Sequence, residues 1–310
     1  MPDERRTLRW KSLSTEAAHP GSDRLDRLGV ARTVARMQAE DRRVLEALRA
    51  ARRDIVRAAE AFRETFLSGK RCLLVGAGTS GRLAVLEAAE LPPTFGTDPR
   101  RVRAVMAGGR TAVFRAREGA EDRSEEGARA AEGLAAGDLA IGVSASSVTP
   151  FVRGALARAK ERGARTVLVT ASRSPGLSRL APIVVRLEVG PEVIAGSTRL
   201  KAGTATKLAL NQITTSALAS SGKVFGPWMV DLRAGSAKSK DRARRIVAAA
   251  AGVSTGKAAM LLKDAKGDVK TAILMGRTRA GYSEAQEALR RAGGDLRKAL
   301  GKKYSSGGRS

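Results

Sequence analysis

Turns rich in glycine and hydroxyl side chains follow several short apolar runs of this 310-residue chain. The first, Gly76–Gly81 (GAGTSG), comes directly after Cys72–Val75 and directly before a stretch with helical periodicity. Its glycines fit G-x-G-x-x-G, a turn that brings backbone N–H groups close to a phosphate at the start of a helix. Thr79 and Ser80 place hydroxyls between the second and third glycines. This turn therefore offers an anion both backbone and side-chain donors.

A dinucleotide site would also require an acidic residue about 20 residues beyond the glycines, at the end of the next strand, to bind the ribose hydroxyls. That strand ends in VMAGGR (Val105–Arg110), which has no carboxylate. Arg110 alone is thin support for a cofactor that carries a 2′-phosphate. The sequence therefore favours a smaller phosphorylated ligand over a dinucleotide.

Three further turns have the same chemistry. SASSVT (Ser144–Thr149) follows an apolar run and opens a helix through Pro150, TAS (Thr170–Ser172) follows another run, and GSTRLKAGT (Gly196–Thr204) precedes a long helical stretch. Helix N-capping alone would explain one such turn. Because the carboxyl ends of parallel strands meet at one edge of a sheet, several such turns can surround one anion there. We therefore expect a small phosphorylated polyol as the ligand.

Acidic residues lie near two of these turns. Glu90 closes the helical stretch that follows GAGTSG, and Glu118–Asp122 (EGAED) lies after the second expected strand. An acidic residue at a helix end is usually a surface charge that complements the helix dipole. Two carboxyl groups beside a phosphosugar can instead act as an acid–base pair, if their surroundings separate their pKa values. These residues alone leave both interpretations open.

Short apolar runs alternate with amphipathic stretches between residues 72 and 220. The expected strands are Cys72–Gly76, Val102–Ala107, Leu139–Val143, Thr166–Thr170 and Ile183–Val189. The expected helices are Ser80–Glu90, Ser124–Leu134, Pro150–Arg162 and Thr198–Ser220. This alternation predicts an α/β fold with a doubly wound, mostly parallel sheet.

Helical periodicity dominates on both sides of that region. Residues 26–67 indicate N-terminal helices, and a small C-terminal helical module is expected at Lys238–Gly252, Ser254–Asp264, Asp268–Met275, Ser283–Arg291 and Asp295–Leu300. We divide the chain into an N-terminal segment with helices (1–58), a sugar-phosphate domain (59–231), the helical module (232–300) and a polar tail expected to be disordered (301–310). No internal repeat is apparent.

Composition narrows the function classes. The chain has 57 Lys and Arg against 31 Asp and Glu, a net charge of +26 that favours anionic substrates and polyanions. Scattered basic residues, 3% aromatic residues and no zinc-ligand spacing disfavour specific nucleic-acid binding. A single histidine, His19, and a single cysteine, Cys72, disfavour histidine-rich metal sites, serine–histidine catalysis and an intrachain disulfide. With no signal sequence or membrane-spanning segment in evidence, we expect a cytoplasmic protein.

Ordered blocks along the sequence resemble those of N-acetylmuramic acid 6-phosphate etherases, a family of the sugar isomerase (SIS) superfamily. The resemblance runs from about Leu13 to Leu300. Glucokinase regulatory proteins are related, but they have duplicated SIS domains and much longer chains. The blocks are LSTE (13–16), GAGTSGRL (76–83), ELPPTFG (90–96), AGG (107–109), EGAED (118–122), GSTRLKAGTATKLALN (196–211), SGKVFG (221–226), MVDL (229–232) and KTAI (270–273).

The resemblance implies a homodimeric lyase with a flavodoxin-like SIS fold that needs no cofactor. Such enzymes cleave the D-lactyl ether of a phosphorylated amino sugar by elimination followed by hydration, in the recycling of cell-wall sugars. By position in the blocks, Glu90 matches the acid that assists lactate departure, and Glu121 matches the second catalytic glutamate, to which we assign deprotonation of C2. The residues expected around the sugar phosphate are Thr79, Ser80, Ser144, Ser146, Ser147 and Thr149.

One block departs from the family pattern. The family usually has Ser-Gly-Arg-Thr-Pro after the third strand, whereas this chain has Ser146–Pro150 (SSVTP). Ser147 thus replaces a glycine that allows close backbone approach, and Val148 replaces a cation. Two alternatives to the etherase therefore stay open: a non-catalytic regulator that binds sugar phosphates, and an isomerase or lyase of another phosphosugar.

Overall fold

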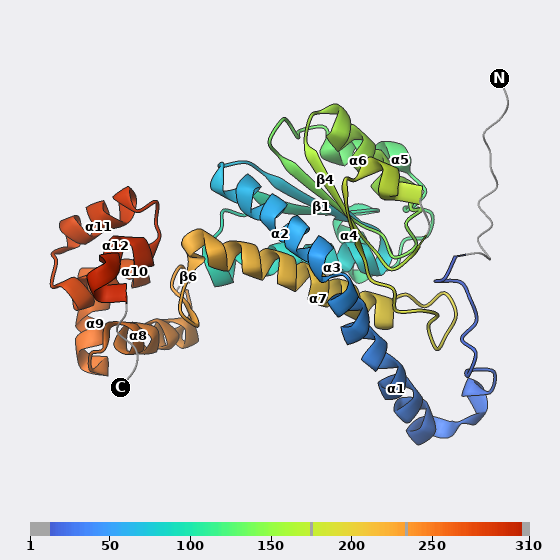
Figure 1. The fold of residues 1–310 in the computed structure, drawn as a ribbon, viewed down its shortest axis with the longest axis horizontal. Helices are drawn as coiled ribbons and strands as arrows, with labels where there is room; N and C mark the ends of the chain where they lie inside the picture. Colours follow the sequence, from blue (N-terminus) through green and yellow to red (C-terminus); the bar gives the residue numbers. More distant parts are fainter. Residues whose placement is uncertain (1–12, 174–175, 233–234, 306–310) are drawn as a thin grey trace. The chain divides into compact units, whose positions relative to one another are not determined.

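The structure is a computed structural model that describes residues 13–173, 176–232 and 235–305 (Figure 1). The chain divides into two compact units. The N-terminal unit contains the residues up to Ala88 together with Arg100–Thr214, and the C-terminal unit contains Ala89–Pro99 and the residues from Thr215 onward. The division at residues 58, 231 and 300 stays a prediction. From residue 306 onward, the tail expected to be disordered lies outside the described residues.

The N-terminal unit contains a five-stranded parallel sheet. Its strands are β1 (Cys72–Gly76), β2 (Val102–Met106), β3 (Leu139–Val143), β4 (Arg165–Thr170) and β5 (Ile183–Arg186), in the order β2-β1-β3-β4-β5. Gly76 pairs with both Met106 and Val143, so the carboxyl ends of three strands are level. The strand order reverses between β1 and β3, and open α/β sheets bind ligands at such a switch point. The expected doubly wound, flavodoxin-like sheet is confirmed.

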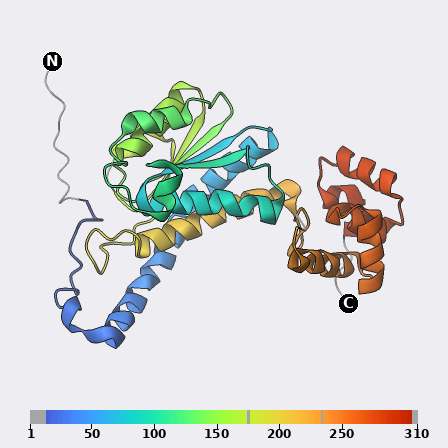
Figure 2. The ribbon, with the colours of Figure 1, turned by 180° about the vertical axis from the view of Figure 1, so that it is seen from behind.

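The helices of this unit lie on both sides of the sheet. They are α1 (Gly29–Ala50), α2 (Arg52–Leu67), α4 (Gly109–Phe114), α5 (Ser124–Ala131) and α6 (Pro150–Glu161), while α3 (Gly78–Phe95) and α7 (Lys201–Leu218) begin in this unit and end in the other. Helices α5 and α6 lie over one face of the sheet (Figure 1, Figure 2), where Leu73 and Val75 pack with Phe151 and Leu156. Helix α2 contacts β1, β3 and β5 on the opposite face.

Each strand begins or ends within three residues of its expected bounds. Helix α3 is longer than expected, because it continues past Glu90 through Pro92 and Pro93 to Phe95. Two further elements, besides short 3-10 and π turns, were not expected from the sequence. One is the six-residue helix α4, and the other is a hairpin of β6 (Val224–Phe225) and β7 (Trp228–Met229) in the C-terminal unit.

Five helices follow that hairpin, in agreement with the expected helical module. They are α8 (Ala237–Ala251), α9 (Thr255–Asp264), α10 (Val269–Thr278), α11 (Tyr282–Arg291) and α12 (Leu296–Ser305). Their buried apolar side chains form one core. Within the unit, the Nζ of Lys270 donates to Asp231 at 2.8 Å and to the carbonyl of Gly294 at 2.6 Å, and Lys223 pairs with the same aspartate at 2.9 Å. The SGKVFG, MVDL and KTAI blocks thus each contribute one charged side chain to these ion pairs.

The C-terminal unit contains an internal repeat, although none is apparent from the sequence. Helices α9 and α10 recur as α11 and α12 with their first residues at one constant offset; α9 and α11 are equal in length, whereas Gly301 interrupts α12 with a non-helical φ of 67°. Asp268 and Asp295 cap the second helix of each hairpin by accepting a backbone N–H. The turn bonds are also equivalent, since the N–H of Gly267 donates to Leu262 as that of Gly294 donates to Leu289. This part of the chain is therefore one helical hairpin used twice.

In the described part of the chain, no single helix has the length and apolar character to cross a membrane. Helices α8 and α9, bent by 106° relative to each other, meet the length and composition criteria only when taken as a pair.

Candidate functional site

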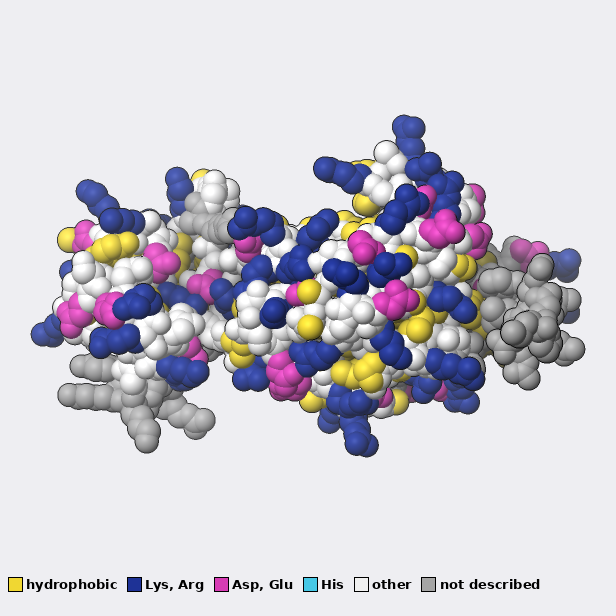
Figure 3. Space-filling view, turned by 90° about the horizontal axis from the view of Figure 1, so that it is seen from above, with side chains coloured by type: hydrophobic (Ala, Val, Ile, Leu, Met, Phe, Trp, Pro, Cys, Tyr) yellow, Lys and Arg dark blue, Asp and Glu magenta, His cyan; other side chains and the backbone are white. Residues whose placement is uncertain are grey.

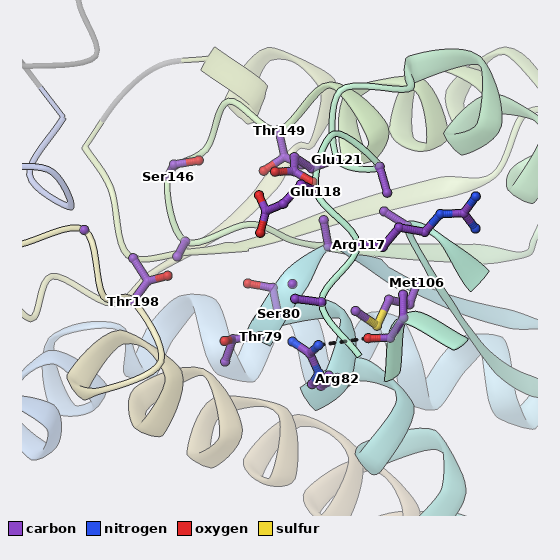
Figure 4. Close-up of a pocket in the computed structure, with 18 of the residues that line it drawn as sticks. Thr79, Ser80, Arg82, Met106, Arg117, Glu118, Glu121, Ser146, Thr149 and Thr198 are labelled. Carbon is purple, nitrogen blue, oxygen red and sulfur yellow. Dashed lines mark hydrogen bonds between the residues drawn. The ribbon is translucent and has the colours of Figure 1, made fainter. Parts of the chain in front are cut away.

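A cavity of about 280 Å³ opens in the N-terminal unit beyond the carboxyl ends of β1, β2 and β3. It lies at the edge where the sequence predicts a phosphosugar. It is lined by the residues around Thr15, the first turn of α3, the end of β2, α4 and the loop after it, the loop before α6, and the turn around Gly196. Figure 4 shows the side chains that project from these segments toward the cavity.

The first turn of α3 forms one wall. Gly78, Thr79 and Ser80 all line the cavity, and Figure 4 shows both hydroxyls on the cavity side of the helix. The first N–H groups of a helix have no partner within the helix, and the helix dipole favours negative charge there. The turn can pass so close to β1 because Gly76 and Gly81 lack side chains: a Cβ on Gly76 would lie 2.8 Å from the N of Gly81.

The loop before α6 forms a second wall. Ser146 and Thr149 line the cavity, and Thr149 lies in a hydrogen bond of 2.8 Å with the hydroxyl of Ser144. Ser144 is buried and is not among the lining residues. Ser147 is also buried outside the lining, where its Oγ accepts from the N–H of Leu177 at 3.3 Å. Of the six hydroxyl residues expected around the phosphate, four thus line the cavity.

The loop between α4 and α5 brings two carboxylates to the cavity. Glu118 and Glu121 both line it, and their side chains lie below Thr149 in Figure 4. The N–H of Phe151 donates to the carbonyl of Glu121 at 2.8 Å, which fixes this residue against the first turn of α6. Glu121 is half-buried, whereas Glu118 is exposed. The backbone of Glu121 is therefore held in place, and its side chain is less solvated than that of Glu118.

Glu90 is not among the residues that line the cavity. It lies on α3 as an exposed residue of the C-terminal unit. Its catalytic assignment rests on the ELPPTFG block alone.

Arginine residues at the cavity were not expected from the sequence. Arg82 donates from Nε to the carbonyl of Val113 at 2.8 Å and from Nη2 to that of Ala112 at 2.9 Å, so it caps the end of α4 from α3. Arg117 also lines the cavity and lies 3.4 Å from the carbonyl of Gly108. Neither contact could be predicted from local sequence. Each depends on how the chain folds to bring a backbone carbonyl of another segment near the arginine.

The N-terminal LSTE block and the GSTRLK block meet at the cavity rim. The N–H of Gly196 donates to the carbonyl of Thr15 at 3.0 Å, and Glu16 and Thr198 line the cavity beside them. A role for the LSTE block at the cavity was not expected from the sequence.

Acidic and basic side chains are both present at the cavity. Glu16, Glu118 and Glu121 line it together with Arg82 and Arg117. Because these side chains do not supply a net positive charge, an anion must rely on the N-termini of α3 and α6 and on the hydroxyls. Among the described residues, no group of three or more His, Cys, Asp or Glu side chains is placed to hold a metal ion.

The chain is similar to a SIS-domain family model and to several etherases. The family model of the glucokinase regulatory protein N-terminal SIS domain matches residues 54–160. The N-acetylmuramic acid 6-phosphate etherase of Geobacillus thermodenitrificans is 45% identical over 290 residues, which cover 93% of this chain and 98% of that protein. The etherase of Rubrobacter xylanophilus is 45% identical over 295 residues, covering 94% and 97%, and that of Mycolicibacterium smegmatis is 42% identical over 292 residues, covering 94% and 98%.

Solved structures of low sequence identity are similar over part of the chain. A putative sugar-phosphate isomerase from Listeria monocytogenes has a TM-score of 0.48 and 14% identity, covering 63% of this chain and 92% of that one. The NanR protein of Vibrio vulnificus, complexed with ManNAc-6P, has a TM-score of 0.43 and 19% identity, covering 64% and 67%.

Proposed function

Because the chain belongs to the N-acetylmuramic acid 6-phosphate etherase family, as its sequence blocks indicated, we propose that it cleaves the D-lactyl ether of N-acetylmuramic acid 6-phosphate. The products are N-acetylglucosamine 6-phosphate and D-lactate. The observation that carries this proposal is the 45% identity to a named etherase over 93% of this chain. The position and chemistry of the cavity support it.

The sugar phosphate is proposed to bind between the N-termini of α3 and α6. Backbone N–H groups of the α3 turn, with the hydroxyls of Thr79 and Ser80, offer donors to the phosphate oxygens. Ser146 and Thr149 offer hydroxyls from the opposite wall. This arrangement requires no cation from the loop before α6, where Val148 is buried. The altered SSVTP loop is therefore compatible with the same substrate.

The reaction is proposed to proceed through the open-chain sugar. Its aldehyde acidifies the proton on C2, and Glu121 removes that proton as general base. The lactate oxygen leaves C3 with a proton from a general acid, because an alkoxide is a poor leaving group; we assign this role to Glu90 from its sequence block. Water then adds to the unsaturated aldehyde at C3 and restores the hydroxyl. No electron acceptor is needed, since elimination and hydration balance without redox change.

The direct test uses purified protein and the muramic acid phosphate in deuterated buffer. We expect release of D-lactate and one solvent deuterium at C2 of the product. Absence of lactate at high enzyme concentration contradicts the etherase. Binding of hexose phosphates in a thermal-shift assay without turnover would identify a regulator instead, the role suggested by the match to a glucokinase regulatory domain.

Isosteric variants distinguish the roles of the two glutamates. Glu121→Gln should slow both lactate release and C2 exchange by roughly 10²–10⁴-fold. Glu90→Gln should stop lactate release while C2 exchange continues. Glu125→Gln, an exposed change on α5, is the matched control and should keep full activity. C2 exchange that survives in Glu121→Gln refutes its assignment as base.

We further propose a cytoplasmic homodimer whose contact includes α1. Val30, Val34 and Leu45 are 83%, 47% and 54% exposed, and their spacing puts them on one stripe of this helix. A second copy of the chain is the proposed occupant of that stripe. The double variant Val30→Asp/Val34→Asp should be monomeric by light scattering, whereas Val56→Asp on α2 should not change the mass. An unchanged mass for the double variant refutes this contact.

A further inference from the structure

Glu40 on α1 is the centre of an ionic cluster that is buried except for Arg43. Its Oε2 accepts from the Nζ of Lys201 at 2.6 Å and lies 3.1 Å from the Nε2 of His19 and 3.2 Å from the Nε of Arg43. The side chains of Lys201 and Glu40 are 2% and 12% exposed. Burial raises the pKa of Glu40, but Lys201 and His19 outweigh this, and the net pKa lies below its usual value. Glu40 is therefore a carboxylate at neutral pH.

Two of these partners belong to segments that line the cavity. His19 follows Thr15 and Glu16; its Nδ1 accepts from the N–H of Gly21 at 3.3 Å, which turns Nε2 toward Glu40. Lys201 is the first residue of α7 and comes directly after the turn that contains Gly196 and Thr198.

The N–H of Gly196 donates to the carbonyl of Thr15, so the two segments also contact each other. Glu40 thus connects one helix to two adjoining parts of the cavity wall.

Such a cluster often stabilises a fold less effectively than apolar packing of the same volume would. Removing charges from water costs free energy, and apolar side chains of similar volume are often at least as stabilising as a buried ion pair. Lys201 also sits at the N-terminus of α7, where the helix dipole disfavours a cation. Glu192 offsets part of that cost by accepting from the N–H groups of Lys201 and Ala202, at 3.1 and 2.8 Å. What the cluster provides instead is directional placement of the residues it joins.

We propose that Glu40 is a positioning residue for the substrate cavity: through His19 and Lys201 it holds the LSTE segment and the Gly196 turn in register, so that Thr15, Glu16 and Thr198 face the phosphosugar. This inference rests on the proposed function. Glu40 itself does not line the cavity, so its effect reaches the ligand only through the two segments.

A double-mutant cycle tests the proposal. Glu40→Gln and Lys201→Met should each raise KM for the muramic acid phosphate, and the dissociation constant for N-acetylglucosamine 6-phosphate, by about tenfold. The change in kcat should be much smaller. The double variant should bind no more weakly than the weaker single variant, because both changes break one interaction. Glu46→Gln, an exposed change six residues further along α1, is the control and should leave both constants unchanged.

Hydrogen exchange gives a second readout of the same change. Hydrogen exchange should speed up in residues 13–22 and 194–200 of Glu40→Gln, while the sheet stays protected. Unchanged binding constants in a folded Glu40→Gln, or independent effects that multiply in the double variant, overturn the proposal. Where Lys201→Met does not fold, His19→Gln takes its place in the cycle. Failure of the wild-type protein to release lactate counts against the proposed function only, since the product-binding comparison still tests Glu40.

Discussion

Ser147 holds a backbone conformation that favours glycine. Its φ is 63°, and Lys266 and Arg279 are the other non-glycine residues with positive φ in the described chain. The etherase family usually has glycine at this place. The serine hydroxyl faces Leu177 rather than the cavity, so the substitution bears on the stability of the loop and not on the lining.

Two variants of Ser147 should differ in stability. Ser147→Ala keeps the left-handed strain and loses the contact between Oγ and the N–H of Leu177; because that N–H still donates to the carbonyl of Ser147 at 2.9 Å, the expected cost is no more than about 0.5 kcal/mol. Ser147→Gly loses the same contact but relieves strain of about 1 kcal/mol, so its free energy of unfolding should stay near the wild-type value. Urea unfolding monitored by circular dichroism measures both. A glycine variant no more stable than the alanine variant contradicts this account of the loop.

The sequence predicted the kind of residue at the cavity better than the direction of each side chain. Thr79, Ser80, Ser146 and Thr149 line it, because they occupy loops that the strand order brings to one edge. Ser144 belongs to the same loop but is buried behind it, since its hydroxyl bonds to Thr149. Which hydroxyl of a turn faces a ligand depends on individual φ and ψ angles, and these angles cannot be predicted from composition.

The turn between β1 and α3 is the element on which the cavity depends most. A Cβ on Gly81 would lie 2.6 Å from the Cγ of Met106 and 2.8 Å from the carbonyl oxygen of Gly76. Gly78 is different, because its φ is +55° and no atom lies within 4 Å of an added Cβ. One glycine is thus required by close packing and the other by backbone conformation.

Gly81→Ala should therefore destabilise more than Gly78→Ala. The first forces α3 away from β1, at about 1–3 kcal/mol, and should also weaken phosphosugar binding because the first turn of α3 moves. The second costs about 1 kcal/mol of left-handed strain without a clash. Chemical denaturation and calorimetric titration with N-acetylglucosamine 6-phosphate give the two comparisons. Equal unfolding free energies for the two variants would show that packing against Gly76 is unimportant.

At the level of elements, the sheet was predictable because its strands are short, buried apolar runs between glycine-rich turns. Helix α4 was missed because six residues are too few to show helical periodicity. The repeat was missed for another reason. Its two halves share small buried residues and capping aspartates rather than long identical stretches, and the equivalence appears only when helix bounds and turn bonds are compared.

The whole molecule carries a net charge of +26. Figure 3 shows Lys and Arg scattered over the visible face with Asp and Glu among them, and no continuous basic stripe. Such a distribution creates a positive long-range potential rather than a specific binding surface. Capture of an anionic substrate is the effect to expect from it.

Ionic strength should therefore change substrate capture and not chemistry. Raising it from about 10 to about 150 mM shortens the screening length from about 30 to about 8 Å, and kcat/KM for the muramic acid phosphate should fall by roughly tenfold. The value of kcat should stay constant, because the reacting groups lie within the cavity. Steady-state kinetics over a salt series give both constants, and a kcat/KM that does not depend on salt would exclude electrostatic capture.

The duplicated hairpin of the C-terminal unit makes more than one helix pairing possible during folding. Helix α9 has two candidate partners at equivalent places in the repeat, α10 and α12, and repeated units can assemble in the wrong combination. The residues between α9 and α10 form one tight turn, with positive φ at Lys266 and Gly267. Because a short loop closes at a lower entropic cost than a long one, α9 meets α10 first. Sequence proximity thus selects the native pairing, and a longer linker at this turn would weaken that selection.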